Sequence, residues 1–395
     1  MLLSRIGYPA NKLFPALRHA RYFMAKPSAL AEDQAEEIKI PVPWGHIAGK
    51  WWGDKNQIPV VALHGWQDNA GTFDRLIPLL NLSSVLAIDM PGHGHSSHLP
   101  AGKIYHVEDL IILLQRIIED QKWGSVPLLT HSFGGNLGFA YASIFPEKVK
   151  YFISFDCART LVTLYTYNTH ATYSEAVESF LKVEKQKLKQ SSPSYKLSEM
   201  IKMTVDGSLG SVCSAESALV LLKRGAKLAD NQSPVSSSSR ASVVSDLETL
   251  MTFERQAAEH FSKEEKEKLL KYHQRILQVA VKSKENIKNF TLDSEQDKYY
   301  TYTRDPGIRI QSFLGFNQDL LIEASKNIKC PVLSIRATDG FLYGSTKKLY
   351  ELTNDNVKAS CSYFEHHDVA GTHHSHLNTP ENVAPIINNF LEKIS

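Results

Sequence analysis

Short, wholly apolar runs alternate with helical stretches over much of the chain. The runs are VVALHG at 60–65, SVLAIDM at 84–90, VPLLTHS at 126–132, YFISFD at 151–156 and PVLSIRATD at 331–339. A strand that is buried on both faces of a parallel sheet needs such a run. Because strand and helix alternate, we expect right-handed crossovers and an α/β fold with a mostly parallel central sheet flanked by helices.

Other patterns predict the elements around this sheet. Apolar residues recur at helical spacing after Tyr105, which predicts a helix that covers the sheet. The runs IKIPVPW and IAGKWW meet at Gly45 and His46, which predicts a β-hairpin. The elements expected after the run at 331–339 are a helix from Thr346, a strand at SCSYFEH (360–366) and a last helix over 381–394.

The alternation of strand and helix stops between residues 158 and 325. The sequence therefore predicts a helical cap inserted between two parts of one core, 36–157 and 326–395. A Ser-rich tract at 231–245 predicts a loop inside this cap. The basic extension over residues 1–35 has no acidic residue before Glu32, which is typical of an organelle transit peptide and equally of an unstructured terminus.

Composition and charge narrow the classes of partner. The chain is 43% hydrophobic and 22% charged with a formal net charge of +2, so we expect no nucleic-acid partner. No apolar run approaches the roughly 20 residues of a membrane-spanning helix, so no integral membrane segment is expected. The four cysteines form no Cys-x-x-Cys pair, and no phosphate-binding or dinucleotide fingerprint is present. We therefore expect no cofactor, and the oligomeric state stays open.

The run LLTHSFGGNLGF at 128–139 contains the candidate nucleophile, Ser132. This serine stands where a buried strand ends and a helix begins, and Gly134 and Gly135 follow closely. A nucleophile elbow needs small residues there because its turn is sharp and strained. Thr130 departs from the usual motif, which has glycine two residues before the serine. The alternative is that Ser132 only caps a helix, but the strand and the glycines favour a nucleophile.

A serine nucleophile needs a histidine base that is held by a carboxylate. Five histidines precede the last expected helix, and His373 is the expected base, with His376 as the alternative. Asp339, at the end of PVLSIRATD, is the expected acid, and Asp156, at the end of YFISFD, is the alternative acid. The order Ser132, Asp339, His373 is the chain order of α/β-hydrolase triads.

Backbone amides complete the predicted site. The N–H groups of Phe133 and Trp66 are expected to form the oxyanion hole, because both follow buried strands of the sheet. The histidine-rich region also raises a metal alternative, since His374-x-His376 resembles the start of a dinuclear hydrolase motif. That motif continues with Asp-His, which is missing here, so we expect no metal site.

With these residues in place, the chain resembles the α/β-hydrolase superfamily and, more closely, the serine hydrolase-like protein family. The stretches that carry the resemblance are VPWGHIAGKWWG near 42–53, LHGWQDNAGTFDRLIPLL near 63–80, DMPGHGHSSH near 89–98, THSFGGNLG near 130–138, LLKRGAK near 221–227 and the loop around His373. The resemblance implies a serine hydrolase in the cytoplasm or in peroxisomes, and the basic N-terminus adds the mitochondrion to these locations.

The expected function is hydrolysis of a small-molecule ester or a related acyl substrate. Ser132, His373 and Asp339 would act as a triad and form an acyl-enzyme. Two alternatives stay open. A carbon–carbon bond hydrolase would use the same triad, and a non-catalytic ligand-binding scaffold would retain the fold without a reactive serine.

Overall fold

The computed structural model describes most of the chain outside the N-terminus and the middle of the insertion. The described residues are 34–157, 169–188, 192–206, 214–229, 298–310, 318–340 and 344–395, with five single positions between 263 and 274. The Ser-rich tract at 231–245 and almost all of the basic extension, two features predicted from the sequence, lie outside the described residues.

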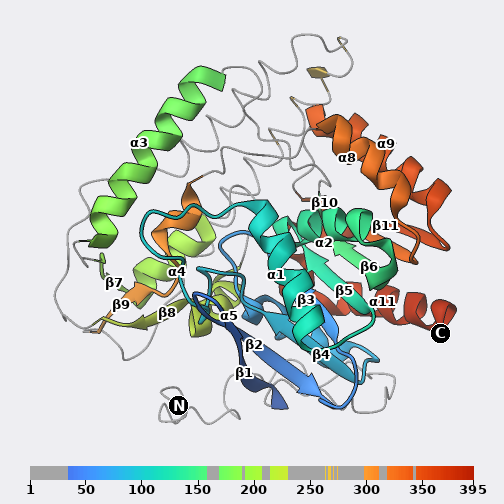
Figure 1. Ribbon diagram of the computed structural model, residues 1–395, viewed down its shortest axis with the longest axis horizontal. Coiled ribbons are helices and arrows are strands. Elements are labelled where there is room, and N and C mark those ends of the chain that lie inside the picture. The colour runs from blue at the N-terminus through green and yellow to red at the C-terminus, as the bar shows by residue number, and fades with distance from the viewer. Residues whose placement is uncertain are drawn as a thin grey trace.

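Eight strands form the central sheet (Figure 1). In their order across the sheet they are β1 (Glu36–Val42), β2 (Gly45–Gly53), β4 (Ser84–Ile88), β3 (Val60–Leu63), β5 (Val126–His131), β6 (Val149–Phe155), β10 (Val332–Asp339) and β11 (Phe364–Thr372). From β4 to β11 neighbouring strands run parallel, whereas β1 and β2 pair antiparallel and β2 is antiparallel to β4. The predicted mostly parallel sheet is confirmed.

The central strands and the hairpin follow the expected burial. Every residue of β3, β4 and β5 is buried, as strands covered on both faces require. The predicted hairpin is β1 and β2, with Gly45 at a φ of 147°. A side chain at Gly45 would collide with Ser97, since a Cβ atom would lie 2.2 Å from the Ser97 hydroxyl oxygen. Glycine is therefore required there by both conformation and space.

Helices cover both faces of the sheet, and each face has its own apolar cluster. On one face pack α1 (Val107–Asp120), α2 (Phe133–Ile144) and α9 (Gly344–Ser360), with η5 (Pro146–Lys148), α8 (Gln318–Ala324) and η8 (Ser325–Asn327) next to them. On the other face pack η3 (Ala70–Phe73), η4 (Ile77–Leu79) and α11 (Pro380–Ile394). These layers confirm the predicted α/β-hydrolase architecture.

The last strand differs from the sequence prediction. We expected it at 360–366, but α9 continues to Ser360 and β11 covers Phe364–Thr372. β11 is the edge of the sheet, and most of its residues are at least partly exposed. An edge strand needs no continuous apolar run, so its polar residues resembled a loop in the sequence.

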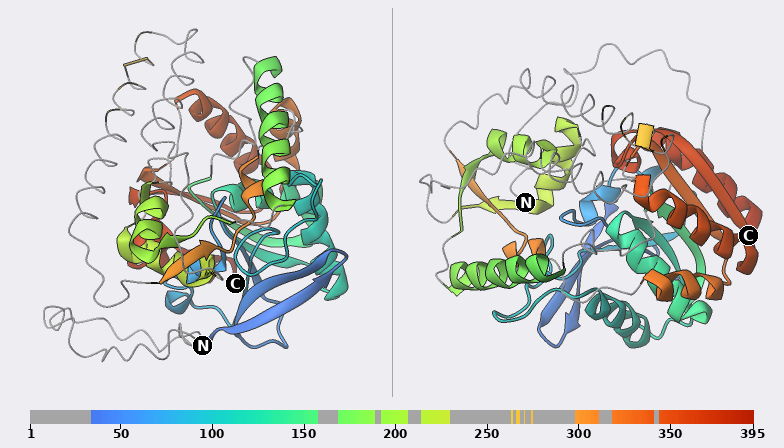
Figure 2. Two further views of the ribbon diagram at one scale, coloured as in Figure 1. Left: turned by 90° about the vertical axis from the view of Figure 1, so that its left-hand side faces the viewer. Right: turned by 90° about the horizontal axis from the view of Figure 1, so that it is seen from above.

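The insertion between β6 and β10 contains a second, smaller sheet (Figure 2). Its described elements are α3 (Thr169–Leu188), β7 (Tyr195–Lys196), α4 (Leu197–Asp206), α5 (Ala215–Gly225), β8 (Ala226–Leu228), β9 (Tyr299–Tyr302) and η7 (Pro306–Arg309). The three strands pair antiparallel in the order β7, β9, β8. Met200, Leu221 and their neighbours form an apolar cluster with Leu377 of α10 (Ser375–Asn378), a short helix of the core.

Polar contacts also attach the insertion to the core. Asp305, which precedes η7, accepts hydrogen bonds at 2.7 Å from both Tyr105 of the core and Lys187 of α3. Burial opposes ionisation of this carboxyl group, but the hydrogen bond from Lys187 and its other donors outweigh burial and lower the pKa of Asp305. No helix in the described parts of the chain is long and apolar enough to cross a membrane.

Candidate active site

Ser132 has the backbone conformation of a nucleophile elbow. It lies between β5 and α2 with φ 52° and ψ −116°, a region that side-chain-bearing residues rarely adopt. Its N–H donates to the carbonyl of Phe155 at 3.0 Å, and its carbonyl accepts from the N–H groups of Gly135 and Asn136. Strained residues that the surrounding structure holds in this way cluster at active sites.

Two glycines provide the space that this turn needs. A Cβ atom on Gly134 would lie 2.3 Å from the carbonyl oxygen of Leu63, so the start of α2 packs directly against the end of β3. Thr130, which stands where glycine is usual, is buried and its hydroxyl donates to the carbonyl of Ile153. Its methyl carbon would be 3.0 Å from a Cβ on Gly138. Gly138 therefore accommodates the bulk of Thr130.

His373 and Asp156 meet at the carboxyl ends of two strands. Nδ1 of His373, just after β11, lies 2.5 Å from Oδ2 of Asp156, just after β6. Because an ionised carboxylate only accepts hydrogen bonds, Nδ1 donates and the lone pair of the neutral ring is on Nε2. Oδ1 of Asp156 accepts from the N–H of Ala337 at 3.1 Å. Asp156 has a positive φ of 38°, so it is strained, as Ser132 is.

Asp339 occupies a neighbouring position on β10. Its Cα is opposite Thr372 of β11, one residue before His373. A Cβ atom on the following Gly340 would lie 2.1 Å from Oδ2 of Asp156, so the Asp156 carboxylate fills the space beside this glycine. Among the described residues, the carboxylate in contact with His373 belongs to Asp156, the alternative acid, and not to Asp339, the first choice from the sequence.

The nucleophile and the histidine are linked through the residue before Ser132. Nε2 of His131 lies 3.0 Å from the carbonyl oxygen of His373, and the two rings are 4.6 Å apart between centroids. The contacts between described residues include no hydrogen bond from the Ser132 hydroxyl to His373. In enzymes without substrate such hydrogen bonds are often long, and they shorten when substrate binds.

His376, the alternative base, is directed into the interior. It is fully buried, its Nε2 lies 2.9 Å from the hydroxyl oxygen of Thr72, and its ring stacks on Phe155. Burial, together with the neighbouring histidines, holds the pKa of His376 well below its usual value. A buried histidine with these neighbours stabilises the turn after β11.

The two expected oxyanion-hole residues lie on segments that touch each other. Phe133 is the first residue of α2, where the backbone N–H has no partner within the helix. Trp66 follows β3, and its indole N–H donates to the carbonyl of Ile308 at 2.8 Å. The N–H of Gln67 donates to Nε2 of His93 at 3.2 Å. The close approach of α2 to the end of β3 brings these segments together.

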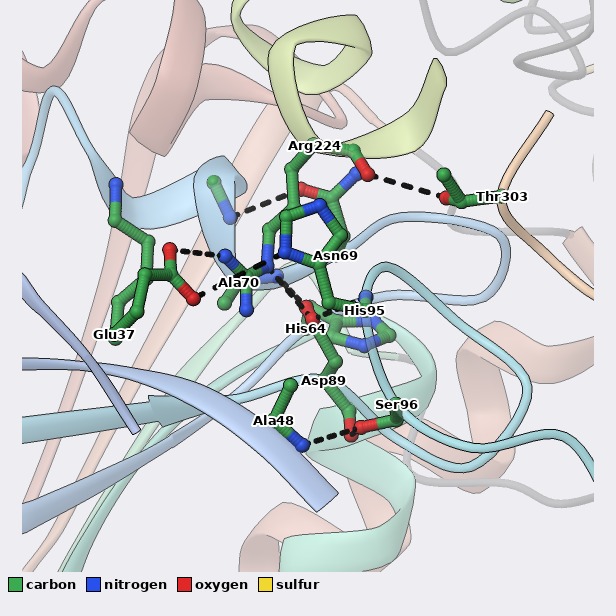
Figure 3. A network of polar contacts seen from close by, with 12 residues as sticks. Glu37, Ala48, His64, Asn69, Ala70, Asp89, His95, Ser96, Arg224 and Thr303 are labelled. Atoms are coloured by element: carbon green, nitrogen blue, oxygen red, sulfur yellow. Dashed lines mark hydrogen bonds and ion pairs between the residues drawn. The ribbon is translucent and has the colours of Figure 1, made fainter. Parts of the chain in front are cut away.

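A buried ion-pair network holds the loop after Trp66 in place (Figure 3). Nε of Arg224, on α5 of the insertion, donates to Oδ2 of Asp89 at 2.7 Å, and its Nη1 pairs with Glu37. Oδ1 of Asp89 accepts from the backbone N–H of Ala70 at 2.8 Å. In the sequence, Arg224 and Asp89 only contribute to the family resemblance. Their structural role could not be predicted there, because their pairing depends on tertiary structure.

A second group of buried polar residues lies beside the site and was not expected from the sequence. Oδ2 of Asp68 is 3.4 Å from Nδ1 of His131 and 3.3 Å from Nε2 of His374. Burial, with a contribution from neighbouring histidine charges, lowers the pKa of His131 to about 3. These residues are far apart in the sequence, and no motif spacing joins them.

Comparison with known proteins identifies the family. The family model described as alpha/beta hydrolase fold matches residues 58–182. A "Probable serine hydrolase" of Drosophila melanogaster is 33% identical over 367 residues, which cover 92% of this chain and 90% of that protein. The chain belongs to the serine hydrolase-like family. A second member, a serine hydrolase-like protein of Danio rerio, is 27% identical over 389 residues, which cover 96% of this chain and 94% of that protein.

A solved structure has a similar fold. A hypothetical protein from Pseudomonas aeruginosa PAO1 matches with a TM-score of 0.64 at 22% identity, over 90% of this chain and 99% of that chain. At this identity the likeness shows the fold alone.

Proposed function

We propose that this serine hydrolase-like protein hydrolyses a small-molecule ester or a related acyl compound through Ser132, His373 and Asp156. The observation that carries the proposal is the strained Ser132 turn next to the buried His373–Asp156 pair, at the carboxyl edge of one sheet. The proposal gives the role of the acid to Asp156 because its carboxylate contacts the imidazole. It needs no cofactor.

The mechanism follows from the atoms in contact. The Ser132 hydroxyl attacks the acyl carbon while its proton passes to Nε2 of His373, and Asp156 stabilises the imidazolium through Nδ1. Backbone N–H groups of Phe133 and Trp66 stabilise the oxyanion; the loss of one such donor typically costs about 10² to 10³ in kcat. His373 then protonates the leaving group. A water molecule then gives its proton to His373 and attacks the acyl carbon. The acid product leaves, and Ser132 takes the proton back.

The insertion is the proposed source of substrate selectivity. Its α5 contacts the loop after β3, where the Asn69 amide donates to the carbonyl of Leu221 at 3.0 Å. Trp66, with 37% of its surface exposed, is also held by the insertion through Ile308. The acyl group would therefore enter between the insertion and the carboxyl edge of the sheet. The predicted cap boundaries, 158–325, remain a prediction.

A panel of p-nitrophenyl esters from acetate to decanoate tests this proposal with the full-length chain. We expect measurable kcat for at least one chain length and a loss of about 10⁴-fold or more in Ser132→Ala. Ser143→Ala is the matched control, because Ser143 lies on the same helix and its hydroxyl only bonds the carbonyl of Phe139. The control should retain the wild-type rate.

Two results would contradict the proposal. Equal hydrolysis by the wild type and Ser132→Ala would show that the turnover does not use this serine. The scaffold alternative would be favoured if the well-folded wild type hydrolysed none of the acyl compounds, and if the wild type and Ser132→Ala both retained a bound ligand.

A further inference from the structure

Asp68, His131 and His374 bring three potential metal ligands, one carboxylate and two imidazoles, to one buried point beside the site. One ligand atom from each lies within 4.8 Å of the others, and all three residues are buried. They come from three separate segments, the loop after β3, the end of β5 and the turn after β11. No step of the proposed hydrolysis uses these side chains.

The unprotonated Nδ1 of His131 faces the Asp68 carboxylate. Nε2 lies 3.0 Å from a carbonyl oxygen, so Nε2 must carry a proton and donate it. In the neutral ring Nδ1 is then an unprotonated lone pair, and it has no hydrogen-bond partner although Oδ2 of Asp68 is only 3.4 Å away. A lone pair and a carboxylate at this distance repel each other unless a cation lies between them.

From this geometry we infer that Asp68, His131 and His374 bind one divalent transition-metal ion of the Zn²⁺ class. A tetrahedral zinc site with bonds of about 2.1 Å has edges of about 3.4 Å between ligand atoms. Oδ2 of Asp68 lies 3.4 Å from Nδ1 of His131 and 3.3 Å from Nε2 of His374, which matches such edges. Two imidazole nitrogens with one carboxylate favour zinc over Mg²⁺ or Ca²⁺, which prefer oxygen ligands.

Two of the three residues, His131 and Asp68, have contacts that metal ligands usually make, whereas Nδ1 of His374 has no hydrogen-bond partner among the described residues. Ligating histidines commonly donate their other N–H to a backbone carbonyl, as His131 does to His373, and ligating carboxylates are hydrogen-bonded in turn. The Thr72 hydroxyl lies 3.4 Å from Oδ2 of Asp68. A Cβ atom on Gly65 would lie 2.8 Å from Nδ1 of His131 and 3.2 Å from Oδ2 of Asp68, so glycine leaves the space beside both ligand atoms open.

The ion would connect the two segments that carry the proposed nucleophile and base. His131 directly precedes Ser132, and His374 directly follows His373. Binding all three ligands would therefore hold the end of β5 against the turn after β11. The role is one of positioning, because the ion touches neither the Ser132 hydroxyl nor the Nε2 atom of His373 in this scheme.

Metal binding can be measured without any hydrolytic assay, so the result is independent of the proposed function. The full-length chain is treated with a chelator, loaded with Zn²⁺, desalted and measured by inductively coupled plasma mass spectrometry. We expect one Zn²⁺ per chain, a Tm raised by a few degrees relative to the stripped protein, and at least a tenfold weaker affinity in Asp68→Asn. His367→Asn is the control, because the side chain of His367 is 40% exposed and pairs with Glu365.

X-ray absorption of the zinc-loaded wild type provides a test that needs no variant to fold. We expect a first shell of nitrogen and oxygen with two imidazoles. No stoichiometric zinc in the wild type, equal loss in Asp68→Asn and His367→Asn, or a shell with fewer than two imidazoles would overturn the inference. A proton shared with His374 would then be the cation that balances Asp68.

Discussion

The assignment of Asp156 as the acid makes a sharp prediction for Asp156→Asn. The N–H of Ala337 donates to Oδ1 and so holds an acceptor at that position. The asparagine oxygen would take this place, which leaves its NH2 group at the position of Oδ2, facing Nδ1 of His373. An NH2 group donates, so Nδ1 would have to accept, and the ring proton would move to Nε2. His373 could then no longer take the proton of Ser132.

The size of the effect follows from this change of tautomer. The same fault costs about 10⁴-fold in kcat in serine proteases, which corresponds to about 5.4 kcal/mol of transition-state stabilisation. The fold should be retained, because asparagine tolerates the positive φ of position 156 better than most residues. We therefore expect Asp156→Asn to lose about 10⁴-fold in kcat on the best ester while its Tm stays close to the wild-type value.

Asp339→Asn is the matched comparison, since Asp339 is the acid that the sequence favoured. We expect its kcat to stay within about tenfold of the wild type, since the carboxylate that holds Nδ1 of His373 belongs to Asp156 and remains in place. Both variants would be measured in parallel for kcat, KM and thermal unfolding. A severe loss in Asp339→Asn with a mild loss in Asp156→Asn would refute the reasoning and move the acid to β10.

Three further predictions concern packing and charge. Gly340→Ala places a methyl group against the Asp156 carboxylate, so kcat should fall about 10²-fold with an unchanged circular dichroism spectrum; a wild-type kcat would disprove this packing. Arg224→Met leaves two carboxylates without their buried cation, and urea unfolding should show a loss of about 3–5 kcal/mol; a loss below 1 kcal/mol would contradict the burial of the pair. Because the pKa of Asp305 is lowered in the fold, its contribution should be present at neutral pH and disappear as pH falls below about 4. Urea midpoints of the wild type and Asp305→Asn should therefore converge at low pH, and parallel curves would exclude this linkage.

The sequence predicted the central strands well because their burial on both faces demands continuous apolar runs. The edge strand β11 was placed four residues too early, since an edge strand tolerates exposed polar residues such as His366 and Asp368. The departure at Thr130 could not be resolved from the sequence. Only the packing of its methyl group against Gly138 shows how the elbow accommodates it.

The choice between the two candidate acids shows a second limit of the sequence. Asp156 and Asp339 stand at the ends of strands that are neighbours in the sheet, so the chain order that favoured Asp339 could not decide between them. The contact with His373 depends on the direction in which each side chain leaves its strand, and this is set by the strained φ of Asp156 and by the space beside Gly340. Spacing motifs likewise could not reveal the group of Asp68, His131 and His374, because tertiary structure alone brings them together.

The most direct test of the central claim is covalent labelling of the purified full-length chain with a fluorophosphonate probe, followed by peptide mass spectrometry. Such a probe reacts with a serine that a neighbouring base activates. The account predicts modification at Ser132 in the wild type, and its disappearance in both Ser132→Ala and His373→Ala. Labelling at another serine, or labelling of Ser132 that is unchanged in His373→Ala, would contradict it.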